Sequence, residues 1–209
     1  MNSVIWTTAL GQTRIGATAE QVDFPTIDEE PVTVAEVLRH LKWPTGTPDE
    51  LDIPRWIRTA RGIVERETKL ALAPQGWNLY LDQWAGFPGW IDLPRAPVVS
   101  VDDVVTIGAD LDETDVDAGS YWADLSARPG RLVFSSAPTM ARVVGAVRVH
   151  YNAGYVDKAA VPPDLIHAVL LLIADIAMHR GDEREPRAEP SVPMGVESLI
   201  NRYVIPSVA

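Results

Sequence analysis

Hydrophobic residues first recur at helical intervals just after Thr33. Thr33 and Glu36 have the spacing of a capping box, and apolar residues follow every three to four positions. This pattern predicts a helix over residues 33–42. A loop with two prolines and a glycine follows, and a second amphipathic pattern predicts a helix over residues 50–70. Because the connection is short, we expect the two helices to form an antiparallel pair.

The hydrophobic period changes from helical spacing to every second residue over 75–151. This β-rich region is predicted to contain strands over 76–83, 90–93, 98–107, 120–125, 131–134 and 146–151. The fourth and fifth of these flank a Ser-Ala-Arg-Pro-Gly turn, which favours a β-hairpin. Since no helix separates the strands, we expect a small antiparallel sheet and not a wound parallel one.

Helical spacing returns after Pro162-Pro163-Asp164, which is a favourable helix start. A long helix is predicted over 164–180. It is apolar on almost every side, so it must be buried or packed against partner chains. Residues 181–209 are interpreted as a charged, proline-bounded linker, a short helix near 196–203 and a C-terminal tail.

Residues 1–31 show no sustained helical or strand period and are interpreted as an N-terminal arm. Two interpretations stay open: a disordered terminus, or an extended arm that lies on a neighbouring chain with Trp6 and Phe24 as its anchors. The remaining organisation is a connector domain over 32–180 and the C-terminal segment 181–209. We therefore predict an α+β protein, with a mainly helical core of about four helices, a small antiparallel β-rich insertion and extended N- and C-terminal arms.

Composition and charge limit the function classes. The chain is 46% hydrophobic and 22% charged, which is normal for a folded globular protein. It has no cysteine, which excludes disulfides and thiolate metal ligands. The net charge of −11 disfavours sequence-independent binding to DNA phosphates. We expect no membrane partner, because no apolar stretch reaches roughly 18 residues and the N-terminus lacks the features of a secretory signal.

The acidic run over residues 110–117 is the best candidate for a metal site. An EF-hand loop needs a glycine at position 6 and a glutamate at position 12. Counted from Asp110, these positions hold Asp115 and Tyr121. We therefore favour a solvated loop between strands over a calcium site.

A catalytic centre has little support elsewhere. Asp175 and His179 are four residues apart on the predicted long helix, so the carboxylate could orient the imidazole. No G-x-S-x-G motif supplies a nucleophile, and a helix-end ion pair is the simpler interpretation. The chain also lacks a Walker A loop, a GxGxxG motif and helix-borne histidine pairs. We expect no catalytic residue, no metal and no cofactor.

Seven tryptophans and an arginine cluster are the features that favour protein contacts. The tryptophans are interpreted either as core and edge packing or as anchors at interfaces. The arginines of the second helix form either a solvated face or an ion-paired contact with an acidic neighbour. We predict that subunits of an assembly meet at Trp56, Arg58, Leu171 and Ile173.

Six segments occur in a fixed order along residues 31–205: VTVAEVLRHL, ARGIVERETKLALAPQGWNLYLD, IDLPRAPVVSVDDV, YWADLSARPGRLVF, VRVHYNAGYVDKAAVPPDLIHAVLLLIADIAMHRGD and PMGVESLINRYVIP. In this order they resemble the head–tail connector (adaptor) proteins of tailed double-stranded DNA bacteriophages and gene transfer agents. The first 30 residues lie outside the resemblance.

The resemblance implies a structural subunit that forms a twelve-membered homo-oligomeric ring beneath the portal. Such a ring would extend the DNA channel, receive stopper or tail proteins and let double-stranded DNA pass through its lumen without specific binding. It also implies assembly in the bacterial host cytoplasm and a place at the head–tail interface of the virion. The portal contact implied by the family's C-terminal segment would consist of Val196, Leu199, Ile200, Tyr203, Val204 and Ile205. Two alternatives remain: another oligomeric virion or DNA-packaging accessory protein, and a metal-dependent enzyme that uses the acidic run.

Overall fold

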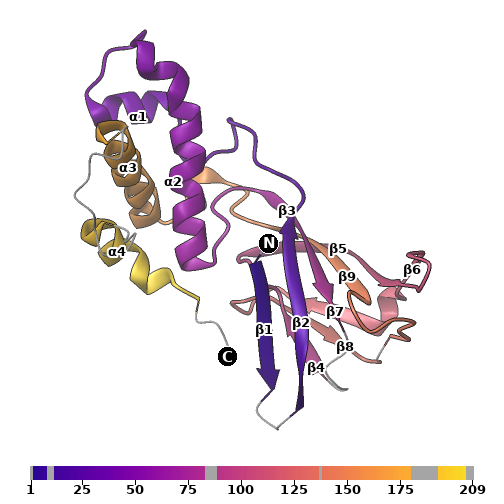
Figure 1. Cartoon of the computed structure of the whole chain (residues 1–209). Helices are drawn as coiled ribbons and strands as arrows, with labels where there is room; N and C mark the ends of the chain where they lie inside the picture. Colours follow the sequence, from indigo (N-terminus) through magenta and orange to yellow (C-terminus); the bar gives the residue numbers. More distant parts are fainter. Residues whose placement is uncertain (1, 9–11, 83–88, 137, 180–192, 206–209) are drawn as a thin grey trace. The chain divides into compact units, whose positions relative to one another are not determined.

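The chain folds into two compact units in the computed structural model (Figure 1). One comprises Met1–Phe24, Pro74–Gly154 and Ile205–Ala209, and the other comprises Pro25–Ala73 and Tyr155–Val204. The structure describes residues 2–8, 12–82, 89–136, 138–179 and 193–205, with side chains from Ala17 onward except Pro48. Most of the predicted linker lies outside these residues. Along the chain, the largest segment of the β-rich unit, Pro74–Gly154, separates the two segments of the helical unit, and the combination of helices and antiparallel sheets confirms the predicted α+β class.

Four α-helices build the helical unit, as the hydrophobic spacing predicted. They are α1 (Val34–Leu41), α2 (Ile53–Thr68), α3 (Pro163–Met178) and α4 (Met194–Ile200). Short 3-10 helices complete the unit at η1 (Pro48–Asp52), η3 (Lys158–Ala160) and η4 (Asn201–Tyr203). Helix α3 packs against α2 and α4 (Figure 1). No described helix is long and apolar enough to cross a membrane.

Helix α1 begins with the capping box that the sequence predicted. The Glu36 backbone N–H donates to Thr33 Oγ1 at 3.2 Å, and the Thr33 backbone N–H donates to Glu36 Oε2 at 2.7 Å. This second bond lowers the pKa of the Glu36 carboxyl. Two backbone donors at the helix start are therefore satisfied by side chains.

Replacing Thr33 by alanine is expected to lower the free energy of unfolding by about 1 kcal/mol, because the cap of α1 loses its acceptor. Chemical denaturation of the purified protein measures this change. Thr45→Ala, at an exposed loop position, is the control and should change stability by less than about 0.5 kcal/mol. Equal losses in the two variants would contradict the capping role.

A buried ion cluster joins α2 to the segment before α1. Arg61 Nε donates to Glu30 Oε2 at 2.8 Å, and Arg61 Nη1 donates to Glu65 Oε2 at 2.6 Å. The second carboxylate oxygen of Glu65 accepts the backbone N–H of Leu72 at 2.7 Å. All three charged side chains are buried. Burial raises the pKa of the Glu30 carboxyl, and the charge of Arg61 opposes that shift.

The β-rich unit holds two antiparallel sheets, where the sequence predicted one. The six-stranded sheet has the order β1-β2-β3-β9-β5-β6, with bounds Asn2–Thr8, Gln12–Gln21, Gln75–Leu81, Val147–Ala153, Val98–Ile107 and Glu113–Asp115. The three-stranded sheet has the order β4-β8-β7, with bounds Gly89–Asp92, Arg131–Phe134 and Tyr121–Asp124. The predicted β7–β8 hairpin is confirmed.

Alternation of apolar and polar residues gives the six-stranded sheet two different faces. On the core face Leu79 lies opposite Val149, and neighbouring buried pairs extend this contact along β3 and β9. On the other face Asn78 lies opposite His150, with the amide oxygen 2.8 Å from the imidazole Nδ1. The core of this unit therefore lies on one side of the sheet.

Two strands occupy much of the region interpreted as an N-terminal arm. Strand β2 pairs with β3, for example Ala19 with Leu79, and β1 pairs with β2. The sequence has no sustained strand period there, so this hairpin is a difference from the predicted arm. Its small residues Gly16, Ala17 and Ala19 have weak strand propensity, and pairing with β3 supplies what the local pattern lacks.

Candidate assembly surfaces

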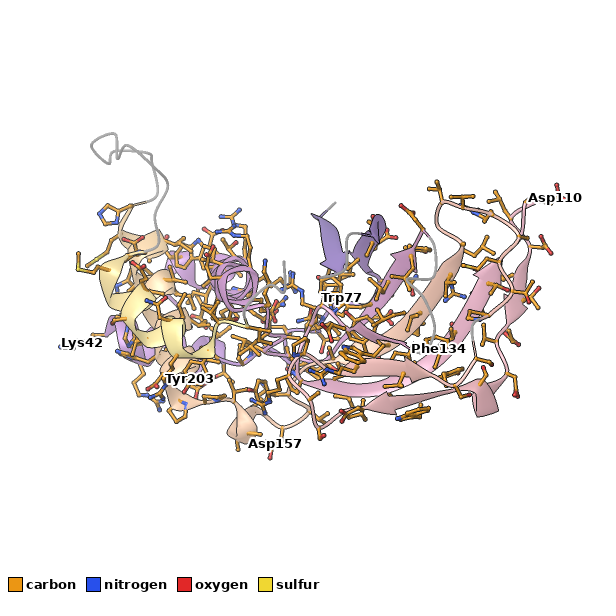
Figure 2. All side chains as sticks on the ribbon, turned by 90° about the horizontal axis from the view of Figure 1, so that it is seen from below. Lys42, Trp77, Asp110, Phe134, Asp157 and Tyr203 are labelled. Atoms are coloured by element: carbon orange, nitrogen blue, oxygen red, sulfur yellow. The ribbon has the colours of Figure 1, made fainter. Side chains whose placement is uncertain are left out.

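The acidic run is partly a strand, where the sequence predicted a loop. Residues Glu113–Asp115 form β6 at the edge of the six-stranded sheet. Arg148 Nη2 donates to Glu113 Oε2 at 2.7 Å and Nη1 donates to Asp103 Oδ1 at 3.1 Å; the bond from Arg148 lowers the pKa of the Glu113 carboxyl. Among the described residues no group of three or more metal-ligating side chains is arranged to hold an ion. The run thus forms an exposed acidic edge, with Asp110 at an outer end of its unit (Figure 2).

Asp175 and His179 form the helix-end pair that the sequence favoured. His179 Nδ1 lies 3.3 Å from the Asp175 carboxylate and 3.0 Å from its backbone oxygen. Both residues stand at the last turn of α3, where a histidine can satisfy a free carbonyl. The pair therefore ends a helix.

Two exposed tryptophans line up across the three-stranded sheet. Trp90 on β4 and Trp122 on β7 both lie opposite Val133 on β8, and they are 60% and 56% exposed. The Arg131 guanidinium lies 5.3 Å from the centre of the Trp90 ring. On the opposite face Leu132 is fully buried. A row of exposed tryptophans is typical of a protein-binding surface, and we call these residues the tryptophan face.

Exchanging Trp90 or Trp122 singly for alanine is expected to cost about 1–2 kcal/mol of folding free energy, because more than half of each residue already faces solvent. The buried residue on the same sheet provides the contrast: Leu132→Ala should cost about 2–5 kcal/mol. Denaturant unfolding of these variants measures the difference. A single tryptophan variant that loses more stability than Leu132→Ala would show that the ring serves the fold and not a surface.

Trp56 and Trp77 are core residues. Trp43 and Trp56 meet edge to face, with ring centres 6.2 Å apart, and Trp56 is buried in the helical unit. Trp77 is buried in the β-rich unit, and the Arg95 guanidinium lies 4.8 Å from its ring centre. The core interpretation is therefore confirmed for Trp56 and Trp77, and the interface interpretation stays a prediction for the exposed Trp90 and Trp122.

The predicted subunit contacts differ in exposure. Trp56 and Ile173 are buried within the helical unit, because they face the packing between its helices. Arg58 is exposed on α2, and Leu171 is half-buried on α3. Only the last two present enough surface for another chain in this conformation.

The C-terminal helix turns its apolar side toward its own unit. Val196 and Ile200 are buried, whereas Leu199 and Ile205 are half-buried and Val204 is exposed. An amphipathic pattern predicts a buried face without naming the partner, and here α3 is the partner.

Polar contacts fix the end of the described chain to the start of α3. The Tyr203 hydroxyl donates to Asp164 Oδ2 at 3.2 Å, and Arg202 pairs with the same carboxylate. The Arg202 guanidinium also lies 4.8 Å from the Tyr203 ring centre. Tyr203 is therefore held in place while remaining half-exposed.

The two expected arm anchors stand in different settings. Phe24 is exposed just after β2. Trp6 belongs to β1 and lies opposite Ile15 in the strand register, but its side chain is outside the described set.

No family model matches this sequence, and no curated protein matches it. Solved structures do share its fold. The neck of an empty gene transfer agent particle computed with C6 symmetry contains a chain 27% identical to it, with a TM-score of 0.69 over 88% of this chain and 95% of that chain. The virion of a native gene transfer agent particle gives 27% identity and a TM-score of 0.69, over 88% and 94%. The neck of the native particle computed with C12 symmetry contains a chain 26% identical to it, with a TM-score of 0.68 over 88% of this chain and 94% of that chain.

The fold of this chain is therefore similar to that of structural proteins in the neck of phage-like particles. Within that class it is similar to a neck chain of gene transfer agent particles, of which it spans nearly the whole length.

Proposed function

We propose that this chain is the adaptor subunit of a head–tail connector, and that twelve copies form a ring beneath the portal. The observation that carries the proposal is the likeness to a neck chain, which covers 88% of this chain and extends over 94% of a chain in a neck computed with C12 symmetry. The ring would extend the DNA channel and receive stopper or tail proteins. It would be assembled in the bacterial cytoplasm and remain in the finished particle.

The chain's surfaces fit a role in protein assembly. The tryptophan face gives one unit an exposed aromatic surface, and Arg58 and Leu171 give the other unit candidate contacts with neighbouring subunits. Val204 and the half-exposed Tyr203 remain as the accessible part of the proposed portal contact. The net charge of −11 suits a channel wall that DNA passes without being held, because phosphates are repelled.

Deleting the gene in the particle-producing host tests this function. We expect filled or leaking heads and separate tails to accumulate, because the component that joins them is missing. Electron microscopy of the lysate measures the outcome, and a plasmid copy of the gene should restore complete particles. Normal tailed particles from the deletion strain would contradict the proposal.

A further inference from the structure

One side of α2 faces solvent along its whole length. Its exposed residues follow at helical spacing and include three arginines; we call this set the basic face: Arg55, Arg58, Thr59, Gly62 and Arg66. Arg55 pairs with Asp52 at 2.8 Å and Arg66 with Glu67 at 3.0 Å. Such exposed pairs are weak, so these guanidinium groups can exchange partners at low cost.

Gly62 stands at the centre of the basic face. A Cβ added there would meet no atom within 4 Å, so no described neighbour requires a glycine at this position. Glycine is the least favourable helix-interior residue apart from proline, because it loses the most backbone freedom. Its advantage is that another chain can approach the helix backbone closely. The position therefore fits a contact with a second molecule.

A complementary surface lies on the acidic edge, which we define as residues 102–117, the second half of β5 and the acidic run that follows it. Residues 102–117 contain seven carboxylates and no lysine or arginine. Among these acidic residues stands Leu111, a leucine 71% exposed with a φ of 68°. A branched side chain in the left-handed region is strained, and an exposed leucine gains nothing from solvent. Burial of the Leu111 side chain against another chain would offset the cost of this backbone conformation.

The loop that carries Leu111 is built to hold it. The Gly108 backbone N–H donates to the Asp112 carbonyl at 2.8 Å, and the Leu111 N–H donates to the Gly108 carbonyl at 3.2 Å. A Cβ on Gly108 would lie 2.1 Å from an Asp112 carboxylate oxygen, so a larger residue there would require the Asp112 side chain to move. Leu111 is thus a fixed apolar projection flanked by Asp110 and Asp112.

We propose that the basic face of one copy binds the acidic edge of the next copy, with Leu111 seated over Gly62. The inference rests on the proposed ring, and it assigns the surfaces that join its subunits. A closed ring needs two different, mutually complementary surfaces on each chain. These two are complementary in charge, basic against acidic, and in shape, a projection against a position without a side chain. Asp110 and Asp112 would pair with the arginines around Gly62.

Gly62→Gln tests the shape complementarity. We expect the isolated chain to melt about 2–4 °C higher, because helix propensity improves. We expect ring assembly to need at least about tenfold more protein, because the new side chain occupies the place of Leu111. Thermal melting and light scattering measure the two effects. Ala35→Gln, at an exposed position on α1, is the matched control and should assemble normally.

Charge reversal provides the second test. Arg58→Asp should weaken assembly, and adding Asp110→Arg in the same chain should restore it, since each copy carries both surfaces. Loss of assembly without rescue by the second substitution would overturn the pairing.

The outcomes also separate the interface from the connector function. If Gly62→Gln forms rings as readily as the parent chain, these surfaces do not join subunits, although the connector function could still stand. If the parent chain forms no ring with or without portal, the connector function itself fails. If Arg58→Asp abolishes retention of a duplex DNA fragment and leaves the ring intact, the basic face binds DNA and the proposal is wrong.

Discussion

Replacing Arg61 by methionine is expected to lower the free energy of unfolding by about 3–5 kcal/mol, because it removes the guanidinium that pairs with two buried carboxylates. Arg61 Nε donates to Glu30 Oε2 at 2.8 Å, and Arg61 Nη1 donates to Glu65 Oε2 at 2.6 Å. Urea or guanidinium denaturation at pH 7 measures the loss. Arg66→Met removes an exposed ion pair from the same helix and should cost less than about 1 kcal/mol.

The loss at Arg61 should depend on pH in a defined direction. Burial raises the folded-state pKa of the Glu30 carboxyl above the unfolded value, and the variant loses the guanidinium charge that opposes this shift. A carboxyl with a raised pKa binds more protons in the folded state, so its stability contribution is lost as the pH rises above the unfolded pKa. The difference in free energy of unfolding between the variant and the parent chain should therefore be smallest near pH 4.5 and larger at pH 7. A loss below about 1 kcal/mol at pH 7, or one independent of pH, would contradict a buried ion cluster.

Leu171→Asp is expected to abolish assembly while the monomer stays folded. Leu171 is half-buried on α3, so a carboxylate there can still reach water in the isolated chain. At the predicted α3 contact with a neighbouring subunit the same carboxylate would be buried without a partner, which costs several kcal/mol and more than about a hundredfold in affinity. Circular dichroism and light scattering separate folding from assembly.

Two further variants make that outcome interpretable. Leu171→Met keeps the volume of the side chain and should assemble normally. Ile173→Ala changes a fully buried neighbour and should cost about 2–5 kcal/mol of folding stability. A Leu171→Asp protein that still forms rings would remove this face of α3 from the proposed subunit contact.

Local signals in the sequence were sufficient for the helices and most strands. The Thr33 capping box marks the start of α1 because its hydrogen bonds involve residues only three apart. The β7–β8 hairpin is equally local, since a short turn connects its strands. In both cases the residues that determine the element lie within the element or beside it.

Features that depend on distant partners were missed. The grouping of strands into two sheets follows from contacts such as β3 with β9, which are about 70 residues apart. The β2 strand also requires β3, because its own small residues give a weak pattern. The arginine pattern on α2 likewise did not reveal that Arg61 is buried, since its partner Glu30 lies 31 residues away.

The sequence identified the kind of surface better than its location. Amphipathic spacing predicted a helix around Val196 and Ile200, but it did not indicate that these residues pack within their own unit. Strand alternation placed Trp90 and Trp122 on strands without showing which face each strand buries. A shift of one residue reverses the two faces of a strand, so exposure follows from the sheet register.

The mass of the purified protein in solution, with and without its matching portal protein, tests the connector proposal most directly. A chain of 22.9 kDa assembled as twelve copies would give a ring of about 275 kDa. We expect this ring either alone or bound to the portal. A monomer of 22.9 kDa that stays monomeric in the presence of the portal would contradict the account.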